Sequence, residues 1–348
     1  MTAQRLSKGG HIDRNQPVSF SWDGIPMNGY AGDTLASALL ANGEQILGRS
    51  FKYHRPRGIM SAGVEESGAL VTVGEGARRD VNVRATTQPL YDGLVARGQN
   101  AWPSVRVDFG AINNLFGRFF AAGFYYKTFM GLPPFEWGRG TGMWMRYEKL
   151  IRKAAGMGEA SREPDPDHYE HAHGYCDLLV VGSGPAGRTA AYTAALAGCD
   201  VVLVEQDAVL GGDSLNRSDH TTILHEELHQ MESAGVRIMP STTAFGLYDG
   251  GVAGLLESVT DHLADPPSWL PRQRFWTLRT RSTILATGAI ERHIAFGNND
   301  RPGVMTANAG RAYLNRFAVQ PGENIVVATN NDSAYAPAFD LASSGAEI

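Results

Sequence analysis

The chain contains very few cysteines, and this scarcity limits the chemistry that it can carry. Cys176 and Cys199 are the only two in 348 residues. An iron–sulfur cluster and a structural zinc ion each take about four ligands, so two cysteines complete neither centre alone. They also form no disulfide framework, which favours a reducing, cytoplasmic compartment. We therefore predict no metal site.

Two further absences narrow the class of protein. Residues 1–16 lack the apolar core of a signal peptide, and the sequence has no run of about 18 apolar residues. We expect a protein that neither spans a membrane nor is exported by that route. A basic charge excess is missing as well, because 31 basic and 36 acidic residues give a net charge of −5. This balance argues against nucleic-acid binding as the main task.

Glycine is the residue in excess, at 41 of 348 positions, or roughly 12% against a usual ~7%. Many glycines in a folded chain indicate tight turns and close backbone approaches. The length predicts about two domains at ~150 residues each. We expect a mixed fold class, with an α+β domain first and an α/β domain after it.

Residues 1–95 have the pattern of a small β-grasp domain. Residues 17–30 alternate between apolar and polar side chains around Asp23 and Gly24, which predicts a hairpin. A helix follows, with Asp33 as its predicted N-cap and Gly43 as its end. Short strands are predicted later in the domain, within 46–53 and 69–76.

Residues 96–172 are predicted to form a connecting arm and linker, in which aromatic side chains gather at 117–145. This segment either packs on another surface or simply bridges two domains. The basic loop 49–57 is equally open: it is either a solvated turn or a site for a nucleotide phosphate or an acidic partner.

A Rossmann-type FAD/NAD(P)-binding domain is predicted over 173–348. Residues 177–206 have the pattern of a buried strand, a glycine turn, an alanine-rich helix and a second buried strand. Gly182, Gly184 and Gly187 form the G-x-G-x-x-G motif, in which the glycines allow a sharp turn, approach of a pyrophosphate and close helix packing. The helix N-terminus would then face the phosphates.

Glu205 ends the second strand at the position where an acid accepts the ribose hydroxyls, which favours NAD or FAD over NADP. Gly211, Gly212 and Asp213 follow as a turn near the nucleotide, and the strand of 282–288 ends at Thr287 and Gly288. Arg188 breaks the expected apolar pattern, and the sequence allows it either at the phosphates or toward a neighbouring domain.

The sequence resembles the α subunit of heterotetrameric sarcosine oxidase over nearly all of its length. The segments that carry this resemblance are GDTLASALLANG (32–43), GRSFKYHRPRG (48–58), FYYKTFM (124–130), EKLIRKAAGMG (148–158), DLLVVGSGPAG (177–187), ATGAIER (286–292), NNDRPGVM (298–305) and VVATNNDSAYAPAFDLA (326–342).

The resemblance implies that the β-grasp domain is ferredoxin-like without a cluster, and no cysteine precedes Cys176. It implies NAD bound in this chain, with a backbone contact at Ala244. The family more often has a small hydroxyl residue where Asp213 stands. Together with the motif, the predicted cofactor-binding residues are Gly182, Ser183, Gly184, Pro185, Ala186, Gly187, Glu205, Gln206, Asp207, Gly212, Asp213, Ala244, Thr287 and Gly288.

The resemblance also implies a reaction and partners. Such enzymes convert sarcosine, oxygen and tetrahydrofolate to glycine, 5,10-methylenetetrahydrofolate and hydrogen peroxide. FAD and FMN lie mostly outside the α chain, with β, γ and δ subunits, and the amine and folate bind elsewhere. The domain is expected to be incomplete at its C-terminus, with an inserted second dinucleotide-type unit starting near residue 323. We assign no catalytic residue to this chain and expect it to be inactive alone.

Two other functions stay open. The glycine motif could bind FAD in an NAD(P)H reductase or an amine dehydrogenase subunit. Alternatively, the chain is a non-catalytic assembly subunit or a truncated fragment.

Overall fold

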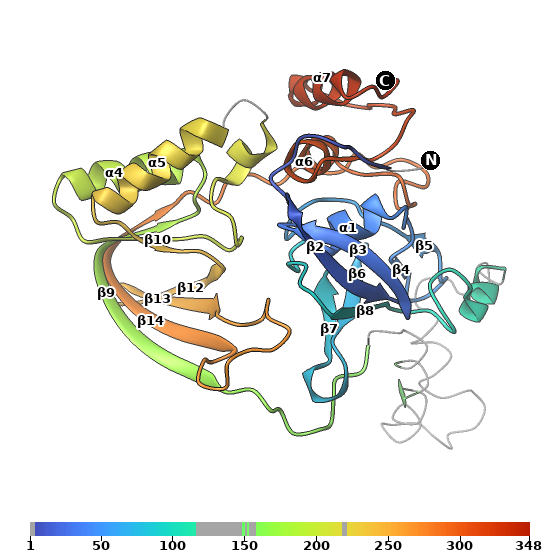
Figure 1. Ribbon diagram of the computed structural model, residues 1–348, viewed down its shortest axis with the longest axis horizontal. Helices are drawn as coiled ribbons and strands as arrows, with labels where there is room; N and C mark the ends of the chain where they lie inside the picture. The colour runs from blue at the N-terminus through green and yellow to red at the C-terminus, as the bar shows by residue number, and fades with distance from the viewer. Residues whose placement is uncertain (1–3, 116–147, 150–151, 153–157, 218–220) are drawn as a thin grey trace, which may run out of the picture.

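The computed structural model describes residues 4–115, 148–149, 152, 158–217 and 221–348. These residues form two units, one built on a five-stranded sheet and one on a six-stranded sheet (Figure 1). The aromatic segment 117–145 lies outside the described residues. Among the helices that the structure describes, none is long and apolar enough to cross a membrane.

The sheet of the first unit has the order β3-β2-β8-β6-β7. The predicted hairpin is confirmed, and Asp23 and Gly24 at its turn both have positive φ, as the tightest hairpin turns require. The central strands β2 and β8 are parallel, which completes the β-grasp arrangement. The strands are β2 (Asp13–Trp22), β3 (Ile25–Ala31), β6 (Leu70–Val73), β7 (Asp80–Arg84) and β8 (Leu94–Gly98).

Helix α1 (Leu35–Ala41) packs on this sheet and is almost wholly buried. The predicted N-cap was wrong by one residue. Thr34 is the cap, because its hydroxyl accepts from Ser37 N at 3.2 Å while the Ser37 hydroxyl accepts from Thr34 N at 3.0 Å. The Asp33 carboxylate instead pairs with Arg5 at 2.7 Å. Gly43 follows the helix with φ +81°, as predicted for a helix end.

Helix α6 (Ala307–Phe317) joins the core of the first unit, although it follows the second sheet in sequence. Tyr313 and Phe317 are among the largest fully buried side chains, and the Tyr313 hydroxyl donates to Ser61 O at 2.9 Å. Strand β15 (Val319–Gln320) then pairs with β1 (Gln4–Arg5). The first unit is therefore assembled from both ends of the chain, as Figure 1 shows.

Four short elements complete this part of the molecule. They are β4 (Gly48–Arg49), β5 (Pro56–Arg57) and the 3-10 helices η1 (Gly76–Arg78) and η2 (Phe109–Asn114).

The second sheet has the order β11-β10-β9-β14-β13-β12. The first four strands pair in parallel, and β13 pairs antiparallel with β14 on one side and with β12 on the other. Its strands are β9 (Tyr169–Val181), β10 (Val201–Val204), β11 (Arg237–Met239), β12 (Thr242–Tyr248), β13 (Val252–Ser258) and β14 (Gln273–Leu285). The associated helices are α4 (Pro185–Leu196), η4 (Gly212–Asn216) and α5 (Thr221–Ser233).

Side chains on the two faces of this sheet enter different cores, as the alternation of a strand requires. Leu178 and Val180 pack with Ala191 of α4 and Met231 of α5. Leu179 points to the opposite face, into a second cluster that includes residues of β13 and β14. The predicted strand–turn–helix–strand arrangement is confirmed.

Three details differ from expectation. β9 begins at Tyr169, inside the range expected to be linker, because residues 169–176 pair with β14. β14 ends at Leu285, two residues before Thr287. At the start of the inserted unit expected near residue 323, residues 325–329 pair with no strand in the described part of the chain, and Val326 is 94% exposed. Helical structure follows, as η5 (Asp332–Ala334) leading into α7 (Tyr335–Ser343).

Candidate functional site

The glycine motif forms an open cradle between β9 and α4. Gly182 has φ +103°, and a Cβ there would clash with the carbonyl oxygen of Ala286, which follows β14. A Cβ at Gly187 would clash with the carbonyl oxygen of Gly182, within the same turn. Gly184 differs, because a Cβ added to it would meet nothing within 4 Å. Pro185 begins α4, and the free N–H groups of the first turn of this helix can face a ligand in this space. Gly182 and Gly187 thus serve the turn and the helix packing that the motif predicts, and Gly184 leaves open space.

Glu205 lies at the end of β10 against this cradle and is 9% exposed. Its carboxylate accepts three hydrogen bonds, from Ser183 N at 2.8 Å, from the Ser183 hydroxyl at 2.6 Å and from Asp207 N at 3.1 Å. A carboxylate has about four lone-pair positions, so about one is left for an incoming hydroxyl donor. This arrangement suits a ribose.

Ser183 and Arg188 hold the cradle in shape. The Ser183 hydroxyl also accepts from Gly211 N at 2.8 Å. Arg188 is buried, donates to Ser183 O at 2.8 Å and to Gly211 O at 3.1 Å, and pairs with Glu227 of α5 at 2.7 Å. The structure therefore resolves the question left by the sequence, because the Arg188 guanidinium fastens loops together inside the second unit.

The turn after β10 approaches the cradle from one side. A Cβ on Gly212, which has φ +55°, would lie 3.0 Å from the Gly184 Cα. Asp213 is exposed, and its carboxylate accepts from Asn216 Nδ2 at 3.1 Å within η4. One carboxylate oxygen of Asp213 is thus engaged in a local hydrogen bond.

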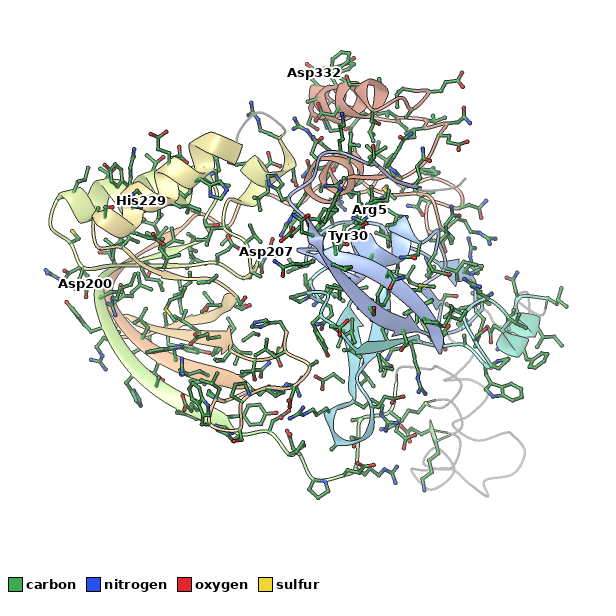
Figure 2. All side chains as sticks on the ribbon, in the orientation of Figure 1. Arg5, Tyr30, Asp200, Asp207, His229 and Asp332 are labelled. Carbon is green, nitrogen blue, oxygen red and sulfur yellow. The ribbon has the colours of Figure 1, made fainter. Side chains whose placement is uncertain are left out.

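The remaining predicted residues lie at different places. Gln206 and Asp207 line a cavity of about 620 Å³ between the two units, and Figure 2 shows Asp207 on the side of its unit that faces the first. Ala244 is half-buried in β12, outside the residues that line this cavity. Thr287 and Gly288 follow β14, and Gly288 has φ +73° with open space around it.

The start of β12 is fixed to the strand end that carries the acid. Thr242 N donates to Glu205 O at 2.7 Å, and Ser241 N donates to Asp207 O at 3.1 Å. Ser241 also lines the cavity. The backbone of residues 205–207 is therefore held in place beside it.

Arg272 holds the opposite side of the cavity. Its guanidinium donates to Asp261 at 2.5 Å, forms a closer pair with Asp80 of β7, and lies 3.6 Å from Asp167. Burial alone would lower the pKa of Arg272, but the hydrogen bonds to Asp261 and Asp80 outweigh it and raise the pKa. Burial also raises the pKa of the cavity-lining Tyr91. The two units are thus tied together by a charged network here.

The arginines of the basic loop 49–57 are paired with carboxylates of the same chain. Arg55 and Arg57 both pair with Asp300, at 2.7 and 2.8 Å. His54 Nδ1 lies 2.7 Å from the fully buried carboxylate of Asp108, and Arg49 lies 3.8 Å from the same group. These pairings favour a structural role for the loop over binding of an external phosphate.

Comparisons with known proteins agree with this two-unit description. The family model of a 2Fe-2S iron-sulfur cluster binding domain matches residues 15–101, and that of an FAD dependent oxidoreductase matches residues 177–253. L-proline dehydrogenase from P. horikoshii superposes with a TM-score of 0.64 at 20% identity, covering 100% of this chain and 55% of that one. The fold class is therefore a ferredoxin-like domain followed by an FAD-dependent oxidoreductase domain.

Two curated relatives are similar along the whole chain. The sarcosine oxidase α subunit of Rhizobium meliloti (strain 1021) is 51% identical, over 100% of this chain and 35% of its own length. That of Corynebacterium sp. (strain U-96) is 35% identical, over 99% of this chain and 32% of its own length. The chain thus spans about a third of the length of the curated relatives that it matches.

The residues of the first unit do not fit an iron–sulfur cluster. Such clusters are held by cysteine thiolates, and residues 15–101 contain no cysteine. Within the described part of the chain, no group of three or more histidine, cysteine, aspartate or glutamate side chains could hold a metal ion. The domain has the fold of a cluster carrier without the ligands.

Proposed function

The chain is homologous over its whole length to sarcosine oxidase α subunits, and on that basis we propose that it is the dinucleotide-binding subunit of a flavin-dependent amine oxidase. Its relatives establish an oxidoreductase with a flavoprotein-type domain. The proposal adds that NAD occupies the cradle of this chain, while FAD and FMN lie mainly with partner subunits.

The reaction follows from the same relationship. We propose that the assembled oxidase acts on a CH–NH donor such as sarcosine, with oxygen and tetrahydrofolate as co-substrates. The partner chains would be β, γ and δ subunits, in the cytoplasm. Because the chain spans about a third of its relatives, the amine and folate sites are assigned to the rest of the assembly.

The open space at Gly184 beside Glu205 is the observation that supports a dinucleotide in this chain. The free N–H groups of α4 can bind a pyrophosphate there, and the last lone pair of Glu205 can accept a ribose hydroxyl. A nicotinamide dinucleotide can exchange a hydride at its ring. Ser183 and Glu205 are already bonded to each other, so we assign these residues to binding and not to proton transfer.

A second candidate is favoured by the FAD dependent oxidoreductase model over residues 177–253. In that case the same cradle holds FAD, and the chain is part of an NAD(P)H reductase or an amine dehydrogenase. Both candidates need the Gly184 backbone and Glu205, so this geometry does not separate them.

Nucleotide analysis separates the two candidates. The purified protein, with whatever subunits accompany it, is denatured, and the released cofactors are identified by mass spectrometry. We expect NAD at about one equivalent per copy of this chain, and partner chains in the native mass spectrum. FAD as the only dinucleotide released, in an amount that falls in a Gly184→Val variant of the same preparation, would overturn the assignment of NAD.

A further inference from the structure

The cavity between the two units begins where the ribose site ends. Residues 206–209 and Ser241 form part of its wall from the second unit, and Asp33, Thr34 and Gln88 form part of its wall from the first. Its volume of about 620 Å³ is in the range of a nucleotide-sized ligand site. An adenosine bound at Glu205 therefore faces the first unit across this space. The inference below rests on the proposed NAD site.

One ion pair crosses from the first unit to this strand end. Arg316 belongs to α6, whose buried face is part of the core of the first unit, and its Nη1 lies 3.0 Å from Asp207 Oδ2. Both residues line the cavity. Arg316 is further held by its own carbonyl, which accepts from His11 N at 2.7 Å, and by its guanidinium, 5.2 Å from the Phe317 ring centre.

The Asp207 side chain is the adjustable part of this pair. The backbone of Asp207 is held at both ends, since its N–H donates to Glu205 at 3.1 Å and its carbonyl accepts from Ser241 N at 3.1 Å. Its carboxylate is about one-third exposed and accepts from Arg316. A substitution of this carboxylate can therefore release the guanidinium without removing the backbone contacts that shape the ribose site.

The charges at this position distinguish NAD from NADP. A 2′-hydroxyl can donate to Glu205, whereas a 2′-phosphate carries about two negative charges and needs a cation. Arg316 is the cation that lies beside the end of β10, and its guanidinium is already paired with the Asp207 carboxylate. We propose that Asp207 determines the selectivity of the site for NAD over NADP, by holding Arg316 in an ion pair and by adding a negative charge beside the 2′ position.

The test compares the two dinucleotides on one set of variants. Nucleotide-free protein is titrated with NAD and with NADP by calorimetry. We expect the unaltered protein to prefer NAD. Asp207→Asn should raise the affinity for NADP by about tenfold, because one repulsive charge is lost and one cation is released. The affinity for NAD should change by less than about threefold. Asp207→Ser is a second variant of the same kind.

The double variant Asp207→Asn/Arg316→Gln separates the two parts of the proposal. It should lose the gain in NADP affinity, and an undiminished gain would overturn the role of Arg316. Asp340→Asn is the matched control. It removes an aspartate of α7 that pairs at 2.6 Å with Arg311, which lies on α6 like Arg316, and Asp340 is outside the residues that line the cavity. It should leave both affinities unchanged.

The outcomes also distinguish this inference from the proposed function. If NAD binds but the ratio of NAD to NADP affinity in both Asp207→Asn and Asp207→Ser equals that of the unaltered protein, Asp207 does not set selectivity and only the inference is wrong. Equal affinities of the unaltered protein for NAD and NADP would also show that only the inference is wrong. If neither dinucleotide binds and the protein retains FAD, the NAD site itself is wrong.

Discussion

The two units differ in what they leave open to a ligand. The first matches the family model of a cluster carrier but has no cysteine in residues 15–101, and its loop 49–57 is closed by the pairing of Arg49 and His54 with Asp108. In the second, Gly184 keeps an open space above the backbone. The comparison shows that a fold can retain its shape while one site is closed by paired side chains and another stays available for a ligand.

Replacing the buried carboxylate of the closed site should have the largest effect. The Asp108 carboxylate is fully buried and accepts from Trp102 N and Gly110 N at 3.0 Å, besides its contacts with His54 and Arg49. Asp108→Ala should lower the free energy of unfolding by about 3–5 kcal/mol, because it leaves the almost wholly buried side chains of His54 and Arg49 without this acceptor. Denaturant unfolding measures this change.

Asp300→Ala is the control for that variant, since Asp300 pairs with two arginines that are only partly buried. It should cost about 1 kcal/mol or less. Equal losses in the two variants would mean that the filled loop of the first unit does not stabilise the fold through its buried charge.

Gly187→Ala should have the next largest effect, on the open site. The added Cβ would overlap the Gly182 carbonyl oxygen, which is backbone and cannot rotate away. We expect the second unit to lose about 3 kcal/mol of stability, through displacement of α4 from β9. Thermal unfolding followed by circular dichroism would show this, and an unchanged melting curve would contradict the tight packing described for this turn.

Gly184→Val should change binding and leave the fold intact. The side chain would enter open space, and Gly184 already has φ −62°, which valine can adopt. Stability should change by about 1 kcal/mol or less. Dinucleotide affinity should fall by about 100-fold, equivalent to about 2.7 kcal/mol, because the pyrophosphate can no longer approach the backbone. Calorimetric titration measures the loss, with Gly297→Val as the control for added bulk, because Gly297 lies outside the cradle and also has open space and no positive φ.

Metal removal should have the smallest effect. Prolonged dialysis against a chelator should shift the melting temperature by less than about 1 °C, since the residues of the first unit do not fit a cluster. Elemental analysis should find less than about 0.1 iron atom per chain. If the protein contains stoichiometric iron and its melting temperature falls on chelation, the first unit holds a metal centre and is not closed to a ligand.

Much of the second unit could be predicted from its sequence because the determinants are local. Gly187 packs on the carbonyl of Gly182, five residues earlier, and the buried strands β9 and β10 flank a single helix. The same locality explains why the hairpin at Asp23 was predicted correctly. The N-cap of α1 was misplaced by one residue for the opposite reason, because a distant side chain decided it. Asp33 and Thr34 are both good caps, and Asp33 was taken by Arg5.

Contacts between distant segments could not be predicted. Arg188 breaks the apolar pattern of its helix, and the sequence did not indicate what its guanidinium contacts. Its partners Gly211 and Glu227 come close to it only in the folded protein. The same is true of the basic loop, where Asp300 lies more than 240 positions from Arg55. Periodicity and motif spacing carry no information about which surfaces meet at such separations.

The sequence by itself determined that this chain begins with a cysteine-free β-grasp domain and carries a glycine cradle with an acid after its second strand. These properties depend on residue identity and short spacing, which set the backbone conformation and the chemistry of nearby groups. Only the tertiary structure decided that α6 completes the first core, that Arg316 meets Asp207 and that a cavity lies between the units. These depend on burial of apolar surface and pairing of charge between segments far apart in the chain.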